Sequence, residues 1–287
     1  MIANWIAEEV ETNKPETVKT YLAALRNHHI EGGFPTDAFD DPRITRVIKG
    51  SLRIQGTRPI RQRLDITKDV LLAIVNTLSV DHDSINLHAA FCVAFAAFLR
   101  PSEFTWDTWN AESSSSHLSR QSIKFTTKGV LLLLPKSKTD QYRKGHTIPL
   151  AFSNDATCPV NSLKTLITKY PKPRSDPLFT RLSGSFNKRW LSYNLALSLR
   201  QAGYDPTHYS GHSFRRGVAN TAIAVGIPRD DIKTLGRWKS DAVDKYFSDY
   251  SKNAVQFDIN QKLHLAPPGR KPPLTLRTPK SNSCGEL

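Results

Sequence analysis

Residues Gly211 to Tyr250 have the sequence GHSFRRGVANTAIAVGIPRDDIKTLGRWKSDAVDKYFSDY. It begins with His212 and Arg215, and a spacing of three residues places both side chains on one face of a helix. Apolar residues continue that helix, and a second helix follows in which we expect Ile232 and Leu235 to be buried. The stretch therefore predicts two helices, the first of which presents a histidine and an arginine together.

The residues after the second helix complete a set that is suited to phosphate chemistry. Gly236, the expected C-cap, is followed by Arg237 and Trp238, and Tyr246 lies on a third short helical stretch. An arginine grips a phosphoryl group in a bidentate fork, a histidine donates or accepts a proton, and a tyrosine can act as nucleophile. The stretch therefore indicates a site that acts on phosphate esters.

These residues resemble a known family. The pattern H-x-x-R from His212 to Arg215, then G-R-W, then Tyr246 is similar to the C-terminal half of the tyrosine recombinase (phage integrase) family. The sequence LGRWKSDA before the tyrosine is similar to the corresponding sequence of Crypton-like transposon recombinases of eukaryotes. The resemblance implies a DNA breaking-rejoining enzyme. It also implies an upstream arginine with a nearby glutamate, and a lysine on a β-hairpin between the two arginine motifs.

The composition fits a globular protein that binds a polyanion. With 287 residues the chain has room for one large or two ordinary domains, and 39% hydrophobic and 23% charged residues are globular values. The formal net charge of +14 favours nucleic acid as the partner, although a basic enzyme of another kind would show it too.

Cysteine and hydropathy patterns exclude other classes. The three cysteines are far apart, and no Cys or His spacing supports a zinc site or a disulfide framework. No nucleotide-binding glycine loop occurs, so we expect neither a metal nor a small-molecule cofactor. No apolar run approaches the ~20 residues that span a bilayer. We therefore expect a soluble intracellular protein with no membrane partner.

Residues 1–62 read as a small helical module. Apolar residues at helical spacing predict helices over residues 1–30 and 41–51. A basic strip follows, with no acid among residues 42 to 64, and it is either a solvated linker or a tether that contacts DNA phosphates. Its members are Lys49, Arg53, Arg58, Arg61 and Arg63. The resemblance implies that this module is the core-binding domain that clamps DNA, in an N-terminally short form.

Residues 63–258 read as the catalytic domain. The nearly all-apolar run from His88 to Leu99 predicts a central core helix, which is followed directly by Arg100 and Glu103. This pair is either a structural ion pair or a functional site that a rigid element presents. The sequence F-L-R-P-S-E is similar to the first arginine motif of the family, which implies that Arg100 binds the phosphate and that Glu103 supports it.

A lysine-rich hairpin is expected inside this domain. Alternating or apolar residues predict strands over 121–125, 129–134 and 146–150, and PKSKTDQYRKG connects the last two. Such a turn is usually a solvated edge. The resemblance implies instead that it carries a catalytic lysine that reaches into the minor groove. Lys138 matches that position best, and Lys136 is the second choice and an expected DNA contact.

These patterns together predict a mainly α protein with a small β-hairpin or sheet (α+β). In it, a helical core-binding module precedes a tyrosine-recombinase catalytic domain. Residues 259–287 are rich in proline and basic residues with little apolar periodicity, so we expect a disordered basic tail.

The resemblance gives each site residue a role in metal-free cleavage of a DNA phosphodiester. Arg100 and Arg215 counter the charge on the phosphate. Lys138 is the expected general acid and His212 the general base or donor. Tyr246 is the expected nucleophile, and its attack leaves a 3′-phosphotyrosyl link that stores the energy for rejoining.

Two assignments stay open. Counting forward from Arg215 places the auxiliary phosphate-binding residue at Trp238, whereas counting back from Tyr246 places it at Arg237. Tryptophan is a family choice at this position, which favours Trp238 and leaves Arg237 as a supporting residue. Tyr250, four residues on and on the same helical face, is the rival nucleophile.

The preferred interpretation is a site-specific DNA recombinase or integrase that acts as a homo-tetramer on two double-stranded DNA sites, with a further DNA contact from Arg216. The first alternative is a catalytically inactive DNA-binding protein that derives from a transposon recombinase. A type IB topoisomerase shares the chemistry, and a basic helix-turn-helix regulator would explain the charge. The resemblance to eukaryotic elements implies a nuclear location.

Overall fold

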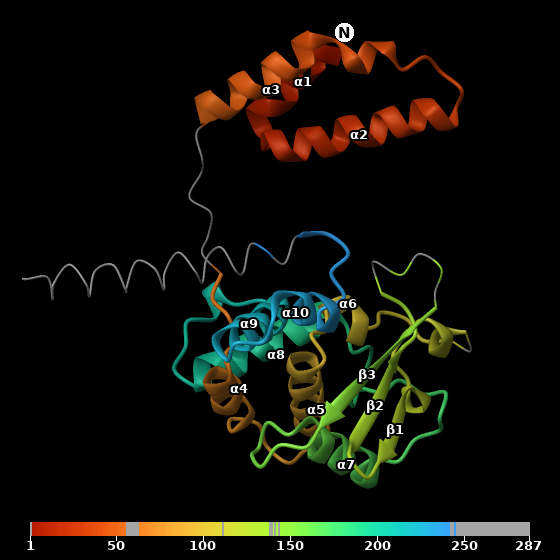
Figure 1. The fold of residues 1–287 in the computed structure, drawn as a ribbon, viewed down its shortest axis with the longest axis vertical. Helices are drawn as coiled ribbons and strands as arrows, with labels where there is room; N and C mark the ends of the chain where they lie inside the picture. The colour runs from red at the N-terminus through yellow and green to blue at the C-terminus, as the bar shows by residue number, and fades with distance from the viewer. Residues whose placement is uncertain are drawn as a thin grey trace, which may run out of the picture. The chain divides into compact units, whose positions relative to one another are not determined.

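The computed structural model describes residues 2–55, 63–110, 112–137, 140, 142, 144–241 and 244. The chain divides into two compact units, Met1–Gln62 and Arg63–Leu287, and each is described by itself (Figure 1). None of the helices within these residues combines the length and the apolar character that crossing a membrane requires.

The first unit is helical. Its elements are α1 (Ile2–Thr12), α2 (Pro15–Glu31), a 3₁₀ turn (Asp37–Asp40) and α3 (Pro42–Gln55). Pro15 lies in the first turn of α2, where its missing N–H has no intrahelical partner to lose. The apolar faces meet in a small core of Ile6, Val10, Val18, Ile44 and Ile48. Lys49 and Arg53, from the predicted basic strip, are exposed on α3.

The second unit is built around one buried helix. Its helices are α4 (Lys68–Val75), α5 (His82–Ala96), α6 (Pro101–Phe104), α7 (Pro159–Lys169), α8 (Lys188–Gln201), α9 (His212–Ala224) and α10 (Arg229–Leu235), with 3₁₀ turns at Ser113–Ser115, Arg120–Ser122 and Pro206–His208. All six residues from Ala89 to Ala94 in α5 are buried. Because α5 contacts α4, α6, α7 and α9, the chain that leaves its C-terminal end starts from a fixed point.

A three-stranded antiparallel sheet lies to one side of the helices in Figure 1. It consists of β1 (Ile123–Thr126), β2 (Gly129–Leu134) and β3 (His146–Ala151), in that order. Val130, Leu132 and Leu134 of β2 are buried, whereas Leu131 and Leu133 are exposed, as a period of two requires. Leu134 pairs with His146, so the lysine-rich connection leaves the sheet at that end.

Helix α9 is packed against the start of the second unit. A Cβ atom on Gly217 would lie 1.8 Å from the backbone oxygen of Ile66, so only glycine permits this approach. The Ile66 N–H donates to the Ser213 carbonyl at 3.1 Å, and the Ser213 hydroxyl donates to the Leu64 carbonyl at 2.7 Å. These contacts fix the orientation of α9, and with it the direction in which Arg215 points.

The predicted fold class, mainly α with a small sheet, is confirmed. Two details differ. The core helix α5 begins at His82 and not at His88, because the Asp81 carboxylate caps it by accepting the Ser84 N–H at 2.9 Å. Leu235, the last residue of α10, is 43% exposed where burial was expected.

Candidate functional site

The first part of the site is the turn that leaves α5. Phe98 adopts a left-handed conformation with φ of 52°, and Arg100 then caps the short helix α6. The Glu103 carboxylate accepts the Arg100 backbone N–H at 2.8 Å and pairs with Arg100 Nη1 at 2.8 Å. Both the main chain and the side chain of Arg100 are therefore held by Glu103.

Arg237, 134 positions later in the sequence than Glu103, contacts the same carboxylate. It follows the C-cap of α10 with φ of 57°, and its Nη2 pairs with Glu103 Oε2 at 3.0 Å. The same guanidinium donates to the carbonyls of Ala97 and Phe98 at 3.0 and 3.1 Å. Burial lowers the pKa of Arg237, and the charge of Glu103 acts against that shift. Glu103 thus bridges two arginines that are far apart in the sequence.

Arg215 lies beside this bridge. Its guanidinium donates to the backbone carbonyls of Phe98 and Gly236, and it stacks over the Trp238 ring at 4.2 Å from the ring centroid. A Cβ atom on Gly236 would lie 1.6 Å from the Trp238 ring. Gly236 is therefore required for the tryptophan to cover Arg215.

The charges of the cluster favour an anion. The cluster contains three guanidinium groups, those of Arg100, Arg215 and Arg237, and one carboxylate, that of Glu103, which pairs with the first and the last of them; the count leaves an excess of two positive charges. The side chain of Arg100 is 14% exposed, whereas that of Arg237 is 4% exposed, and Arg215 as a whole is 3% exposed. Arg100 is thus the most accessible of the three cations, and the other two are preorganised behind it.

His212 begins α9, on the same helix as Arg215, and is exposed. Partial desolvation lowers the pKa of its imidazole below the ordinary value, and the charges of Arg215 and Arg100 act in the same direction. The ring is therefore neutral at neutral pH, a state in which one nitrogen accepts a hydrogen bond and the other donates one.

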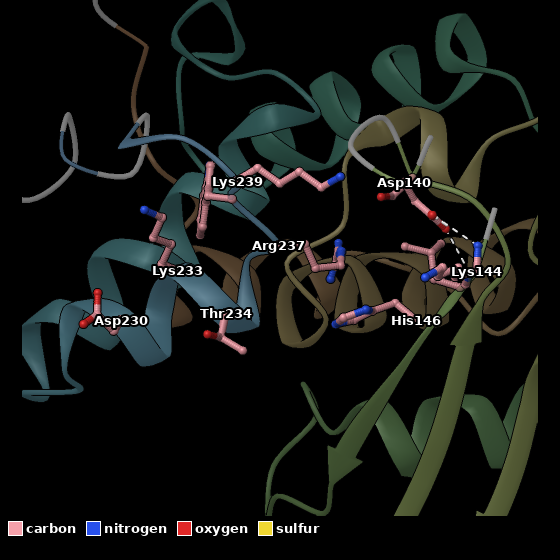
Figure 2. A pocket seen from close by; sticks show the side chains of 12 residues that line it. Asp140, Lys144, His146, Asp230, Lys233, Thr234, Arg237 and Lys239 are labelled. Carbon is pink, nitrogen blue, oxygen red and sulfur yellow. Dashed lines mark hydrogen bonds between the residues drawn. The ribbon is translucent and has the colours of Figure 1, made fainter. Parts of the chain in front are cut away.

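A cavity of about 590 Å³ lies next to the cluster, between the hairpin and α10 (Figure 2). Asp140, Lys144 and His146 line it from the hairpin side, and Lys233 and Lys239 extend from the other side. Arg237 and Trp238 belong to its lining, so the cavity opens onto the arginine cluster.

Asp140 closes the hairpin loop at the edge of this cavity. Its carboxylate accepts the backbone N–H groups of Gly145 at 2.9 Å and Lys144 at 3.1 Å. These hydrogen bonds, the one from Gly145 first, lower the pKa of Asp140, and the positive charge of Lys239 adds to the shift. Asp140 thus holds the part of the loop from which Lys144 lines the cavity, whose charged lining is four cationic side chains and the two carboxylates of Asp140 and Asp230.

The structure brings together five of the predicted site residues, namely Arg100, Glu103, Arg215, Arg237 and Trp238. It shows Arg237 and Trp238 in two different places, one on Glu103 and the other on Arg215, where the sequence had left a choice between them. Lys138, Tyr246, its rival Tyr250, Arg58 and Arg61 lie outside the described residues, and their roles stay predictions.

The remaining predicted DNA contacts are in different environments. Lys136 is exposed at the start of the hairpin loop. Arg63 donates to the carbonyls of Thr207 and Tyr209 at 3.1 and 2.9 Å. Arg216 pairs with Asp65 at 3.0 Å, and it also donates to a backbone carbonyl. The guanidinium groups of Arg63 and Arg216 therefore hold the start of the second unit, and their contacts with DNA stay predictions.

The sequence did not single out the other residues that line the cavity. Asp140, Lys144 and His146 form part of the hairpin motif, and Lys239 follows G-R-W directly. Their position in the sequence next to predicted site residues is the signal that could have identified them. Within the described ranges, no group of three or more His, Cys, Asp or Glu side chains is placed to hold a metal ion.

No protein-family model matches the chain. One relative by sequence is the integrase/recombinase XerD homolog of Selenomonas ruminantium, which is 26% identical over 251 residues. The match covers 84% of this chain and 70% of the relative.

Two solved structures of DNA-bound recombinases are similar in fold. The Tn1549 transposon integrase in complex with a circular intermediate DNA matches with a TM-score of 0.58 and 10% identity, over 89% of this chain and 83% of that one. The XerH site-specific recombinase bound to palindromic difH substrate, in a post-cleavage complex, matches with a TM-score of 0.51 and 12% identity, over 68% of this chain. This chain covers 52% of XerH, about half of its length.

At such low identity the two structures establish the fold, which is that of tyrosine recombinase catalytic domains.

Proposed function

We propose that this protein is a site-specific DNA recombinase or integrase that breaks and rejoins DNA through a 3′-phosphotyrosyl intermediate. The observation that carries the proposal is the cluster in which Glu103 bridges Arg100 and Arg237 beside the stacked pair of Arg215 and Trp238. A fixed excess of positive charge of this kind stabilises a phosphate whose negative charge grows in the transition state.

The proposed reaction needs only the residues of the chain. The Tyr246 phenol oxygen attacks the scissile phosphorus in line, the bond from phosphorus to the 5′-oxygen breaks, and Lys138 gives that oxygen a proton. Arg100 and Arg215 bind the non-bridging oxygens, and His212, neutral at neutral pH, accepts the proton of the phenol or donates to the phosphate. Attack by a 5′-hydroxyl on the phosphotyrosine reverses these steps and rejoins the strand.

The scheme requires Arg215 to exchange a hydrogen-bond acceptor when DNA binds. Arg215 is 3% exposed and donates to the backbone carbonyls of Phe98 and Gly236. We expect a bound phosphate oxygen to replace one of these acceptors. Trp238, stacked on the guanidinium, keeps the orientation of the fork while the exchange occurs.

The partners follow from the same proposal. Tn1549 integrase and XerH are seen with their DNA, and the net charge of +14 suits double-stranded DNA as the partner here. We propose a homo-tetramer on two DNA sites. We also propose that the protein comes from a Crypton-like transposon of eukaryotes and acts in the nucleus. This part of the proposal rests on the sequence LGRWKSDA around Trp238.

The test is covalent trapping on nicked DNA. A binding site is first selected from random duplexes with the full chain, and a nick next to the cleavage position then prevents rejoining. A denaturing gel should show a protein–DNA adduct for the wild type and for Tyr250→Phe, and none for Tyr246→Phe. Salt-sensitive binding without any adduct would make the chain a catalytically inactive DNA-binding protein. Relaxation of supercoiled DNA by single protomers would favour a type IB topoisomerase.

A further inference from the structure

A second cavity, of about 730 Å³, lies along β1. Its charged lining residues are Arg120, Lys124, Lys172 and Arg174, and no carboxylate among the described residues lines it. None of its described lining residues also lines the cavity beside the arginine cluster. We name this second cavity the β1 groove. Its charge favours an anionic ligand at a place separate from the cluster.

Arg120 is a buried cation in this groove. It lies in the 3₁₀ turn that precedes β1 and is 6% exposed. Its backbone N–H donates to the Asp176 carbonyl at 2.9 Å, but its side-chain nitrogens are buried and have no hydrogen-bond partner among the described residues. Burial lowers the pKa of Arg120 to about 10, although the charge of Asp176 opposes the shift, so the guanidinium is charged at neutral pH. Because a buried charge is costly unless an anion compensates it, this side chain indicates a ligand that brings an anionic group.

The edge of β1 is open to another strand. In the described sheet, β1 lies at the edge beside β2 (Figure 1). Because the hairpin closes at Thr126 and Gly129, the antiparallel alternation turns the N–H and C=O groups of Ile123 and Phe125 away from β2. Within the described residues, no backbone hydrogen bond outside the ladders involves either residue. The edge thus offers two donors and two acceptors to an added strand.

Apolar side chains line the groove beside these cations. Phe125, Leu131 and Leu133 belong to its lining and are 43%, 38% and 47% exposed. Side chains of an extended strand point alternately to its two sides. A segment with both acidic and apolar residues can therefore satisfy the cations and cover the apolar side chains while its main chain pairs with β1.

Charge complementarity decides between the occupants. Residues 261–287 of this chain contain five Lys or Arg residues and one Glu, and a second copy carries the same net charge of +14. Both would bring positive charge to a cationic groove. A DNA backbone would satisfy the cations, but it would leave the free backbone groups of β1 unpaired and the apolar side chains exposed. The groove therefore fits an acidic segment of a different protein.

We propose that the β1 groove binds an extended acidic segment of a partner protein as an added strand, and that a carboxylate of this segment pairs with Arg120. The backbone groups of Ile123 and Phe125 hold the main chain of the segment, and Lys124 and Arg174 attract its other acidic residues. Because the nitrogens of Arg120 are buried, its side chain rotates towards the groove on binding. This inference does not depend on the proposed function, since no residue of the groove belongs to the arginine cluster.

The first experiment uses a probe peptide and the ¹⁵N-labelled full chain. The peptide is acetylated and amidated and consists of alternating Glu and Val. In two-dimensional NMR we expect it to shift the amide signals of residues 120–126, and we expect the same peptide with Lys in place of Glu to leave them unshifted. N-methylation of all Val residues, or of all Glu residues, blocks one edge of the peptide, and one of these two versions should lose the shifts. Absence of the shifts with the unmodified peptide, or their persistence with both methylated versions, would overturn the added strand.

The second experiment measures the affinity of the same peptide for variants of the groove. Lys124→Glu should weaken binding by about fivefold or more, whereas Lys164→Glu, at an exposed position outside the groove, should stay within about twofold of the wild type. Arg120→Met should also weaken binding. It should raise the midpoint of urea unfolding as well, because it removes a buried charge that has no partner in the free protein. Peptide affinity that Arg120→Met leaves unchanged would overturn the role of Arg120, whatever its midpoint.

Two further probes distinguish the other occupants. Inorganic phosphate that reproduces all shifts of the peptide would reduce the groove to a site for small anions. A DNA duplex of random sequence that shifts the same amides, and whose binding Lys124→Glu weakens as strongly as that of the peptide, would make the groove a nucleic-acid contact. Either result would overturn the proposal, whereas shifts of residues 120–126 that only the acidic peptide produces would support it.

Discussion

Replacing Glu103 by glutamine tests the charge balance of the arginine cluster. The Glu103 side chain is 3% exposed, and its two oxygens pair with Arg100 at 2.8 Å and Arg237 at 3.0 Å. Glutamine keeps the shape and removes the charge. We therefore expect Glu103→Gln to leave two largely buried guanidinium groups with no carboxylate between them.

The magnitude follows from the burial of the partners. Removal of one member of a buried ion pair costs about 3–5 kcal/mol. We expect the lower end, about 3 kcal/mol, because the amide oxygen still accepts one hydrogen bond and Arg237 keeps its bonds to the carbonyls of Ala97 and Phe98. In a unit of this size each kcal/mol lowers the Tm by about 2–4 °C. The expected decrease in Tm is therefore about 6–12 °C.

The assay is urea and thermal unfolding of the wild type, Glu103→Gln and Glu112→Gln. Glu112 is exposed, so its variant should stay within about 0.5 kcal/mol of the wild type. If Glu103→Gln also stays within about 0.5 kcal/mol, the carboxylate does not compensate the two arginines and the reasoning is refuted.

Three further predictions follow from the same structure. Gly236→Ala places a methyl group 1.6 Å from the Trp238 ring, so we expect a loss of about 1–3 kcal/mol in urea unfolding, and a wild-type midpoint would contradict the stacked arrangement. Gly217→Ala should be destabilising by at least as much, because its methyl group would lie 1.8 Å from a backbone oxygen. Gly50→Ala, in an open helical position, should instead stabilise by about 0.5–1 kcal/mol. The opposite order of the two unfolding midpoints would refute this packing. The pKa of His212 is lowered from 6.5 by partial desolvation. The folded state therefore disfavours the protonated imidazole, and the free energy of unfolding decreases as the pH falls below 6.5. When the pH is lowered from about 7 to 5, the free energy of unfolding should therefore decrease less for His212→Gln than for the wild type. An equal or larger decrease would contradict the lowered pKa of His212.

The local structure of the second unit could be predicted from the sequence because its signals are local. The apolar run before Leu99 identified the core helix, and the alternation in residues 129–134 identified β2. The pair of Arg100 and Glu103 was found because it follows a buried element directly. Each of these signals needs only a few neighbouring residues.

The link between Glu103 and Arg237 could not be predicted in this way. It joins residues that are 134 positions apart, and it depends on the left-handed conformation of Arg237, which is uncommon for a residue other than glycine. The sequence therefore left Arg237 and Trp238 as alternatives, whereas the fold places each on a different partner.

The exposure of Leu235 shows the limit of the helical pattern. Its spacing of three from Ile232 suggested one buried face, and Ile232 is fully buried. Helix α10 ends at Leu235, however, and the described part of the chain leaves the side chain of that residue 43% exposed. Periodicity predicts a face and does not say where the core that covers it ends.

The most direct test of the central claim is the identity of the residue that becomes linked to DNA. The adduct formed on nicked DNA is digested with nuclease and protease, and the modified peptide is sequenced by mass spectrometry. The account predicts a nucleotide bound through phosphate to Tyr246, and a strong decrease in its yield in Arg100→Ala. A nucleotide on Tyr250 or on any other residue, or DNA binding with no modified peptide, would contradict it.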